Sequence, residues 1–99
     1  MSNVNLSANK EELQNILNNY GVTDVSVFGS FARGEATQKS DLDLLVTYQQ
    51  GTTLFDVANL QDALEKALNR KVDLVSRKYL SKRLATRIEK DIKPLSSIL

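Results

Sequence analysis

Hydrophobic positions along this chain switch between a helical period and a strand period. Over residues 7–19 apolar side chains recur three and four positions apart, the spacing of one buried helix face. The same spacing recurs over 53–69 and over about 79–92. Short runs rich in Val, Leu and Phe predict strands at 22–28, 42–48 and 71–76. A turn with a short helix at 29–34 and a polar loop at 35–40 join the first two strands.

Because helices and strands alternate, we expect an α/β fold with helices packed on a sheet. The chain has 99 residues, so one domain over 1–99 is expected. No repeat, low-complexity tract or linker divides it. Thr53 and Asp56 have the spacing of a capping pair at the start of the second long helix, and Asn9 with Glu12 repeats that spacing at the first.

Two carboxylates interrupt the second predicted strand. Asp41 and Asp43 are two positions apart, so their side chains point to one face, whereas Leu42, Leu44 and Val46 point to the other. Two such charges at 4 Å repel by about 4 kcal/mol near a protein surface. A cation between them removes this repulsion, so the pair predicts a divalent metal site.

The turn between the first two strands predicts a place for phosphate. Gly29 allows the backbone to approach a phosphate closely, and Ser30 offers an N–H and a hydroxyl at a helix start. Asp73, in the third strand, joins the other two acids if that strand lies beside the second. Three carboxylates suit two Mg²⁺ ions. The alternatives are an ordinary turn glycine with Asp41 and Asp43 solvated at a strand edge, and an Asp73 at a strand edge that pairs with Lys71 or Arg70.

Composition removes several classes of function. The chain has no Cys and no His, which excludes disulfides, thiol nucleophiles, Ser-His-Asp catalysis and histidine zinc sites. No stretch is apolar enough to span a bilayer and the start is polar, so we expect a cytoplasmic protein.

Acidic residues dominate up to Glu65 and basic residues from Lys66 onward. The basic half is either a solvated helix face or a docking surface for an acidic partner, for which Arg83 and Arg87 are candidates.

A phosphate-loop ATPase is excluded by the residues after the turn. Gly29 and Gly34 have the Walker separation, but Glu35 and Ala36 stand where that motif needs Lys and Ser or Thr. The dinucleotide pattern Gly-x-Gly-x-x-Gly is also absent. A nucleic-acid binder needs aromatic side chains among its basic residues, and the basic half offers only Tyr79, so nucleic acid is not the partner we expect.

Three segments resemble the minimal nucleotidyltransferases of the DNA polymerase β-like superfamily. They are 29–34 (GSFARG), 40–46 (SDLDLLV) and 72–75 (VDLV), and the resemblance extends over nearly the whole chain. It implies the nucleotidyltransferase fold, a small mixed β-sheet flanked by helices in the order α-β-α-β-α-β-α.

The resemblance also implies a role for each matching residue. Gly29 and Ser30 correspond to the triphosphate-binding turn, and Asp41 and Asp43 to ligands of both metals. Asp73 corresponds to a ligand of the catalytic metal that helps to deprotonate the attacking hydroxyl. For Arg33 two interpretations stay open, a contact with phosphate or a surface pair with Glu35.

Small members of this family often act as antitoxins, which implies transfer of AMP from ATP to a tyrosine of a HEPN-type ribonuclease toxin, with two Mg²⁺ ions as cofactors. Two other functions stay open on the sequence. One is an antitoxin that neutralises its partner by binding alone, and the other is a nucleotidyltransferase that acts on a small molecule or an RNA end.

Overall fold

A computed structural model describes residues 6–99, so the first five residues of the expected domain lie outside the described part. The helices and strands follow the expected alternation. Their bounds are 3-10 helix η1 (Leu6–Asn9), α1 (Lys10–Asn19), β1 (Val22–Phe28), α2 (Ser30–Arg33), β2 (Leu42–Tyr48), α3 (Leu54–Leu68), β3 (Val72–Ser76), η2 (Arg77–Tyr79), α4 (Lys82–Ile88), β4 (Lys93–Pro94) and η3 (Leu95–Ile98).

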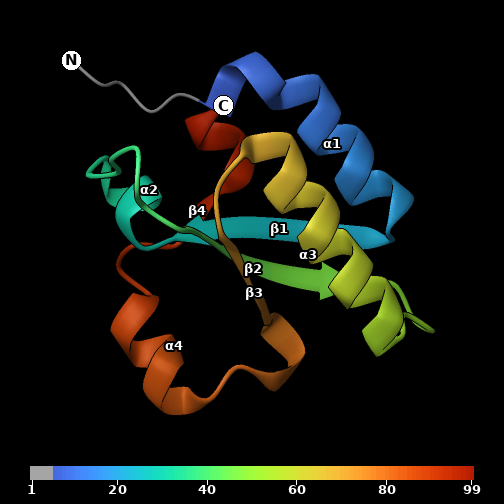
Figure 1. Cartoon of the computed structure of the whole chain (residues 1–99). Helices are drawn as coiled ribbons and strands as arrows, with labels where there is room; N and C mark the ends of the chain where they lie inside the picture. The colour runs from blue at the N-terminus through green and yellow to red at the C-terminus, as the bar shows by residue number, and fades with distance from the viewer. Residues whose placement is uncertain (1–5) are drawn as a thin grey trace.

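The strands form one mixed sheet in the order β3-β2-β1-β4. β1 pairs antiparallel with β2 and with β4, whereas β2 and β3 run parallel. The parallel pair needs a crossover connection, and α3 supplies it. α1 and α3 lie together over one face of the sheet and α4 lies over the other (Figure 1). This arrangement confirms the expected mixed sheet flanked by helices.

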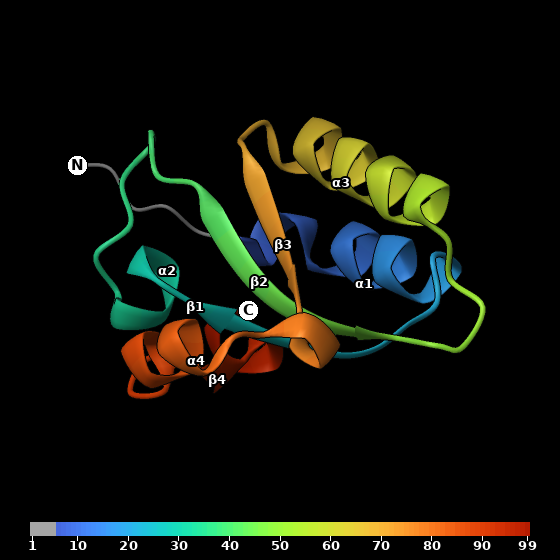
Figure 2. The ribbon, with the colours of Figure 1, turned by 90° about the horizontal axis from the view of Figure 1, so that it is seen from below.

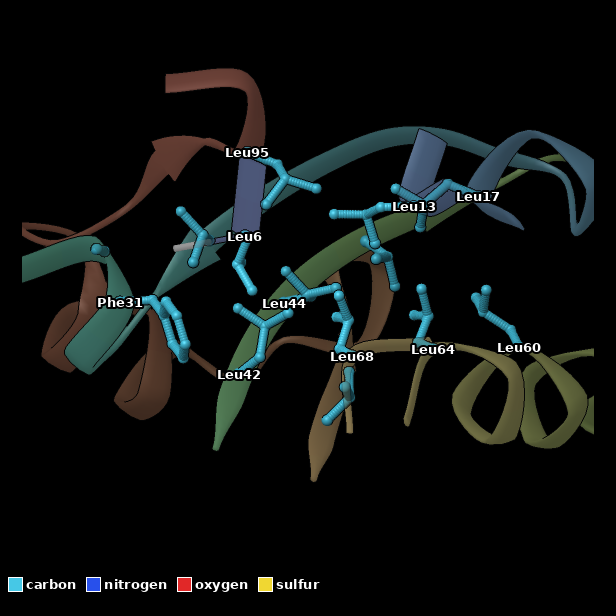
Figure 3. Packing of buried hydrophobic residues seen from close by; sticks show 14 residues of the cluster. Leu6, Leu13, Leu17, Phe31, Leu42, Leu44, Leu60, Leu64, Leu68 and Leu95 are labelled. Atoms are coloured by element: carbon cyan, nitrogen blue, oxygen red, sulfur yellow. The ribbon is translucent and has the colours of Figure 1, made fainter. Parts of the chain in front are cut away.

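Side-chain alternation along the strands divides the core into two layers. Leucines of β2 point between α1 and α3, where they meet leucines of both helices (Figure 3). A smaller cluster on the opposite face joins Phe28 and Leu45 to Ile88 of α4. Residues two apart along β2 therefore share a layer, and neighbouring residues face opposite helices. The view from the α4 side shows β2 and β3 side by side (Figure 2).

The capping expectations had opposite outcomes. The Thr53 hydroxyl accepts from the Asp56 N–H at 3.2 Å, and the Asp56 carboxylate accepts from the Thr53 N–H at 2.9 Å, which is a complete capping box. Asn9 precedes α1, but its side chain makes no capping hydrogen bond. The chain enters α1 from the 3-10 helix η1, so the Asn9 backbone lacks the extended conformation that a cap requires.

The segment predicted as a single helix over about 79–92 contains a shorter helix in the structure. Ser81 caps α4 by accepting from the Leu84 N–H at 3.1 Å, so the helix begins after Ser81. It ends at Ile88, and the following residues return to the sheet as β4, which the periodicity did not indicate. Pro94 suits this edge strand because a proline has no N–H to donate to a further strand. None of the helices within residues 6–99 combines the length and hydrophobicity of a bilayer-spanning segment.

Candidate active site

Asp43 and Asp73 meet on the face of the sheet that α4 covers. Parallel pairing of β2 with β3 places the two residues directly opposite one another. Their neighbours Leu44 and Leu74 belong to the layer beneath α1 and α3, so both carboxylates project from the other face. The structure thus brings together two of the three expected acids, from segments 30 residues apart in the chain.

The pair is electrostatically coupled. The pKa of Asp43 is raised from 3.8 to about 6, chiefly by partial burial, and also by a side-chain hydrogen bond with Asp73 and by the negative charges of Asp73 and Asp41. The positive charge of Arg33 acts in the opposite direction and lowers this pKa. A carboxyl whose pKa is raised by a neighbouring carboxylate is suited to exchange its proton for a cation.

Gly29 fits closely against the Asp43 side chain. Its backbone has φ +74° and ψ −152°, a region that essentially only glycine occupies. A Cβ atom built on Gly29 would overlap Asp43 Oδ2 and stand 3.3 Å from Asp43 Cγ. Glycine is therefore required here both by backbone conformation and by the space that Asp43 fills.

Asp41 directly precedes β2, which begins at Leu42, as the predicted strand does. Its charge still acts on Asp43, and the Leu42 N–H donates to the Lys71 oxygen at 2.9 Å, which ties this end of β2 to β3. Across residues 6–99, no group of three acidic side chains is arranged so that it could hold a metal ion. The three expected ligands thus do not form a closed cage in this structure.

The oxygen donors present nevertheless fit Mg²⁺. This ion is usually bound by one or two carboxylates together with waters and substrate phosphates, and not by a cage of protein ligands. The facing carboxylates of Asp43 and Asp73 provide two such ligands, and their mutual repulsion in the charged state favours a cation between them. The part of the site that the structure assembles is therefore consistent with a metal shared between protein and phosphate.

The Gly29 turn leads from β1 into the four-residue helix α2. Ser30 is the first residue of α2 and is partly exposed, and its backbone oxygen accepts from the Glu35 N–H at 2.9 Å. Gly34 ends α2 in the left-handed conformation. The turn is thus a compact loop of fixed shape that leaves the Ser30 hydroxyl at the surface.

Arg33 forms ion pairs with two acids. Its Nε donates to Glu35 Oε1 at 2.8 Å and its Nη1 donates to Asp91 Oδ2 at 3.0 Å. Both hydrogen bonds raise the pKa of Arg33. The pair with Glu35 agrees with the interpretation of Arg33 as a surface residue paired with Glu35. The pair with Asp91, 58 residues away, was not predicted because no nearby residue indicates it. The same guanidinium is near enough to lower the pKa of Asp43, so Arg33 borders the carboxylate pair.

Arg70 was considered only as a partner for Asp73, and the structure shows different contacts. Its Nη1 donates to the backbone oxygen of Ser40 at 2.7 Å, and its guanidinium stacks on Phe31 with Cζ 4.9 Å from the ring centroid. Asp73 is therefore left facing Asp43. The sequence indicated only that Arg70 is a basic residue just before the strand that carries Asp73. It did not indicate the contacts with Ser40 and Phe31.

Chemically, the site offers two carboxylates that can accept a proton or bind a cation, beside the Gly29 turn. A basic side chain lies at its border. These groups are those that a phosphoryl or nucleotidyl transfer needs, because the reaction moves a proton and stabilises charge on phosphate oxygens.

Comparison with known proteins agrees with this geometry. Residues 11–97 match the family model described as polymerase beta, nucleotidyltransferase. The protein adenylyltransferase MntA of Thermococcus cleftensis is 36% identical over 87 residues, which cover 88% of this chain and 85% of the relative.

Two solved structures are also similar. One, described as a minimal nucleotidyltransferase, superposes with a TM-score of 0.78 at 44% identity and covers 91% of this chain and 92% of that one. The other, a toxin-antitoxin structure with AMP-PNP, has a TM-score of 0.73 at 25% identity and covers 88% of this chain and 72% of that one. With the family model matching most of its length, the chain belongs to the polymerase beta nucleotidyltransferase family.

Proposed function

We propose that this nucleotidyltransferase is an antitoxin that transfers AMP from ATP to a tyrosine of a HEPN-type ribonuclease toxin, with Mg²⁺ as cofactor. The observation that carries the proposal is the in-register pair Asp43–Asp73 beside the Gly29 turn. The similarity to a protein adenylyltransferase and to an antitoxin solved with an ATP analogue supports a protein acceptor and ATP as the donor.

In the proposed reaction, the triphosphate of ATP lies against the Gly29–Ser30 turn. The acceptor hydroxyl gives its proton to Asp73 while its oxygen forms a bond to the α-phosphorus. The bond between that phosphorus and the oxygen bridging to the β-phosphate breaks, and pyrophosphate leaves. Mg²⁺ bound by Asp43, Asp73 and Asp41 would supply positive charge for the phosphates.

The remaining residues act by position. Gly29 keeps the turn against Asp43, so that phosphate bound at the turn lies next to the carboxylates. Ser30 contributes its hydroxyl and the start of α2. Arg33, at the border of the carboxylate pair, is proposed to contact a phosphate oxygen when ATP is bound.

The experiment that tests this function follows the label of ATP. The chain is mixed with the ribonuclease encoded beside its own gene, with Mg²⁺, and with ATP labelled at the α- or the γ-phosphate. We expect the α label, and not the γ label, on the toxin, and loss of the product when the acceptor tyrosine is changed to Phe. A γ label on the toxin would identify a kinase and overturn the proposal.

A variant with all three acids changed to Asn separates catalysis from binding. We expect it to bind the toxin and leave the ribonuclease active. Full protection by this variant would identify an antitoxin that works by binding alone. Label on an added RNA or small alcohol, with none on the toxin, would identify a different acceptor.

A further inference from the structure

Arg70 touches two segments of the active site at once. It lies two residues before β3, and its Nη1 donates to the Ser40 oxygen at 2.7 Å and to the Thr37 oxygen at 3.4 Å. On another side its guanidinium covers the ring of Phe31 in α2. One side chain therefore joins the loop before β2 to α2, while its own backbone leads into β3.

Each of these segments carries a residue of the proposed site. Ser40 is followed by Asp41, Phe31 is preceded by Ser30, and Asp73 lies three residues after Arg70. We propose that Arg70 is a positioning residue that holds the Asp41 segment and α2 in register with the Asp43–Asp73 pair. The predicted effect of Arg70 on AMP transfer rests on the proposed function. The contacts of Arg70 with Ser40, Thr37 and Phe31 belong to the fold and do not depend on that function.

The chemistry of the contact explains why the residue is an arginine. A guanidinium can donate along its plane and stack through its face at the same time, which a lysine ammonium cannot do. The bond to Ser40 is short, as expected when the donor is charged. Arg70 Nε is buried and has no hydrogen-bond partner within residues 6–99, so the guanidinium is held there without full satisfaction of its donors.

The loop that Arg70 holds is otherwise closed by short-range contacts. The Ser40 N–H donates to the Thr37 oxygen at 3.1 Å, and the Thr37 N–H donates to the Ser40 hydroxyl at 2.8 Å. These bonds fix the shape of the turn but do not attach it to α2 or to the residues before β3. The bond from the Leu42 N–H to the Lys71 oxygen attaches the start of β2 to the residue before β3. Arg70 adds the attachment of the loop itself by binding the carbonyls of Thr37 and Ser40.

The test compares Arg70→Met and Arg70→Lys with Lys71→Met, a charge-matched control at the next, exposed position. The first readout is amide hydrogen exchange in the chain without nucleotide or metal. We expect exchange about tenfold faster at the Ser40 and Leu42 amides in Arg70→Met, an intermediate change in Arg70→Lys and none in Lys71→Met. Amides in the middle of α3 should exchange at the wild-type rate in all three.

The second readout is AMP transfer with the toxin as acceptor. Arg70→Met should raise the Mg²⁺ concentration for half-maximal transfer and the KM for ATP about tenfold, with the KM for the toxin unchanged. Equal acceleration of exchange across the whole chain, or no acceleration at Ser40 and Leu42, would overturn the positioning role. If the wild-type chain transfers no AMP, the proposed function fails, and the exchange measurement still decides whether Arg70 holds the loop.

Discussion

Asp43 lies so close to Gly29 that position 29 has no room for a side chain. At φ +74° a larger residue is already strained, and an added Cβ would overlap the carboxylate oxygen of Asp43. The turn and the acid therefore specify each other's position. This contact links the proposed phosphate turn directly to the carboxylate pair.

Changing Gly29 to Ala is expected to harm both stability and transfer. The strained backbone should lower the free energy of unfolding by about 1–3 kcal/mol. The new methyl group should push Asp43 out of its contact with Asp73, so AMP transfer should fall further than the loss of folded protein explains. Urea denaturation and single-turnover transfer on the folded fraction measure the two effects.

Gly34→Ala is the matched control for this variant. Gly34 has nearly the same φ, +73°, but no atom lies within 4 Å of the position of its added Cβ. We expect a stability loss of about 1–2 kcal/mol from the left-handed backbone, with transfer retained. Equal loss of transfer in both variants would show that backbone strain alone, and not displacement of Asp43, explains the effect.

The stability of the metal-free chain should decrease as the pH rises from about 4 to about 6. The pKa of Asp43 is raised to about 6 by burial and by Asp73, so the folded state binds a proton more tightly than the unfolded state. The stabilisation from that proton is complete below the unfolded pKa of 3.8 and is lost as the pH passes through 6. Urea titrations at several pH values in EDTA measure it, with constant stability from pH 4 to pH 7 as the contradicting result.

Asp43→Asn should separate stability from activity. A neutral amide removes the repulsion from Asp73 and Asp41, so the metal-free variant should be more stable than wild type at pH 7.5 by roughly 1 kcal/mol, after allowance for solvent screening. The same variant should transfer no AMP, and EDTA should abolish transfer by the wild type. A variant as active as wild type would remove Asp43 from the site.

Local chemistry in the sequence predicted the features that depend on neighbours along the chain. Alternation in β2 and β3 placed Asp43 and Asp73 on one face, and the parallel register then brought them together. The box between Thr53 and Asp56 was predicted from a spacing of three residues. The capping box is determined within three residues, whereas the sequence predicted the acid pair only on the condition that the two strands lie side by side.

Features that depend on distant contacts could not be predicted. Asp91 pairs with Arg33 only because the chain turns back after α4, and the backbone of β4 joins the sheet through two residue pairs. Arg70 reaches Ser40 across 30 residues. A side chain that bonds to a carbonyl leaves no pattern at the acceptor, since every residue type offers that group.

Substitutions at Arg33 and at its two ion-pair partners test whether Arg33 also contacts the phosphates of ATP. If Arg33 contacts phosphate, Arg33→Ala should raise the KM for ATP roughly tenfold, because a charged donor to the triphosphate is lost. Glu35→Gln and Asp91→Asn break the ion pairs but keep the guanidinium, so the KM for ATP should stay near the wild-type value. A similar rise in all three variants would assign Arg33 to holding α2 and not to binding ATP.

The basic face of α4 is expected to contact the toxin. Arg83 and Arg87 are exposed and one turn apart, on the face of the sheet toward which Asp43 and Asp73 project, so a toxin whose tyrosine enters the site must approach this helix. Changing both to Glu should weaken toxin binding about tenfold and make the affinity less dependent on salt.

Lys10→Glu with Lys66→Glu is the control for this variant. It makes the same charge change on α1 and α3, across the sheet, and should leave toxin binding unchanged. Calorimetry at two ionic strengths distinguishes a local contact from an effect of net charge, because equal weakening by both pairs would indicate net charge alone.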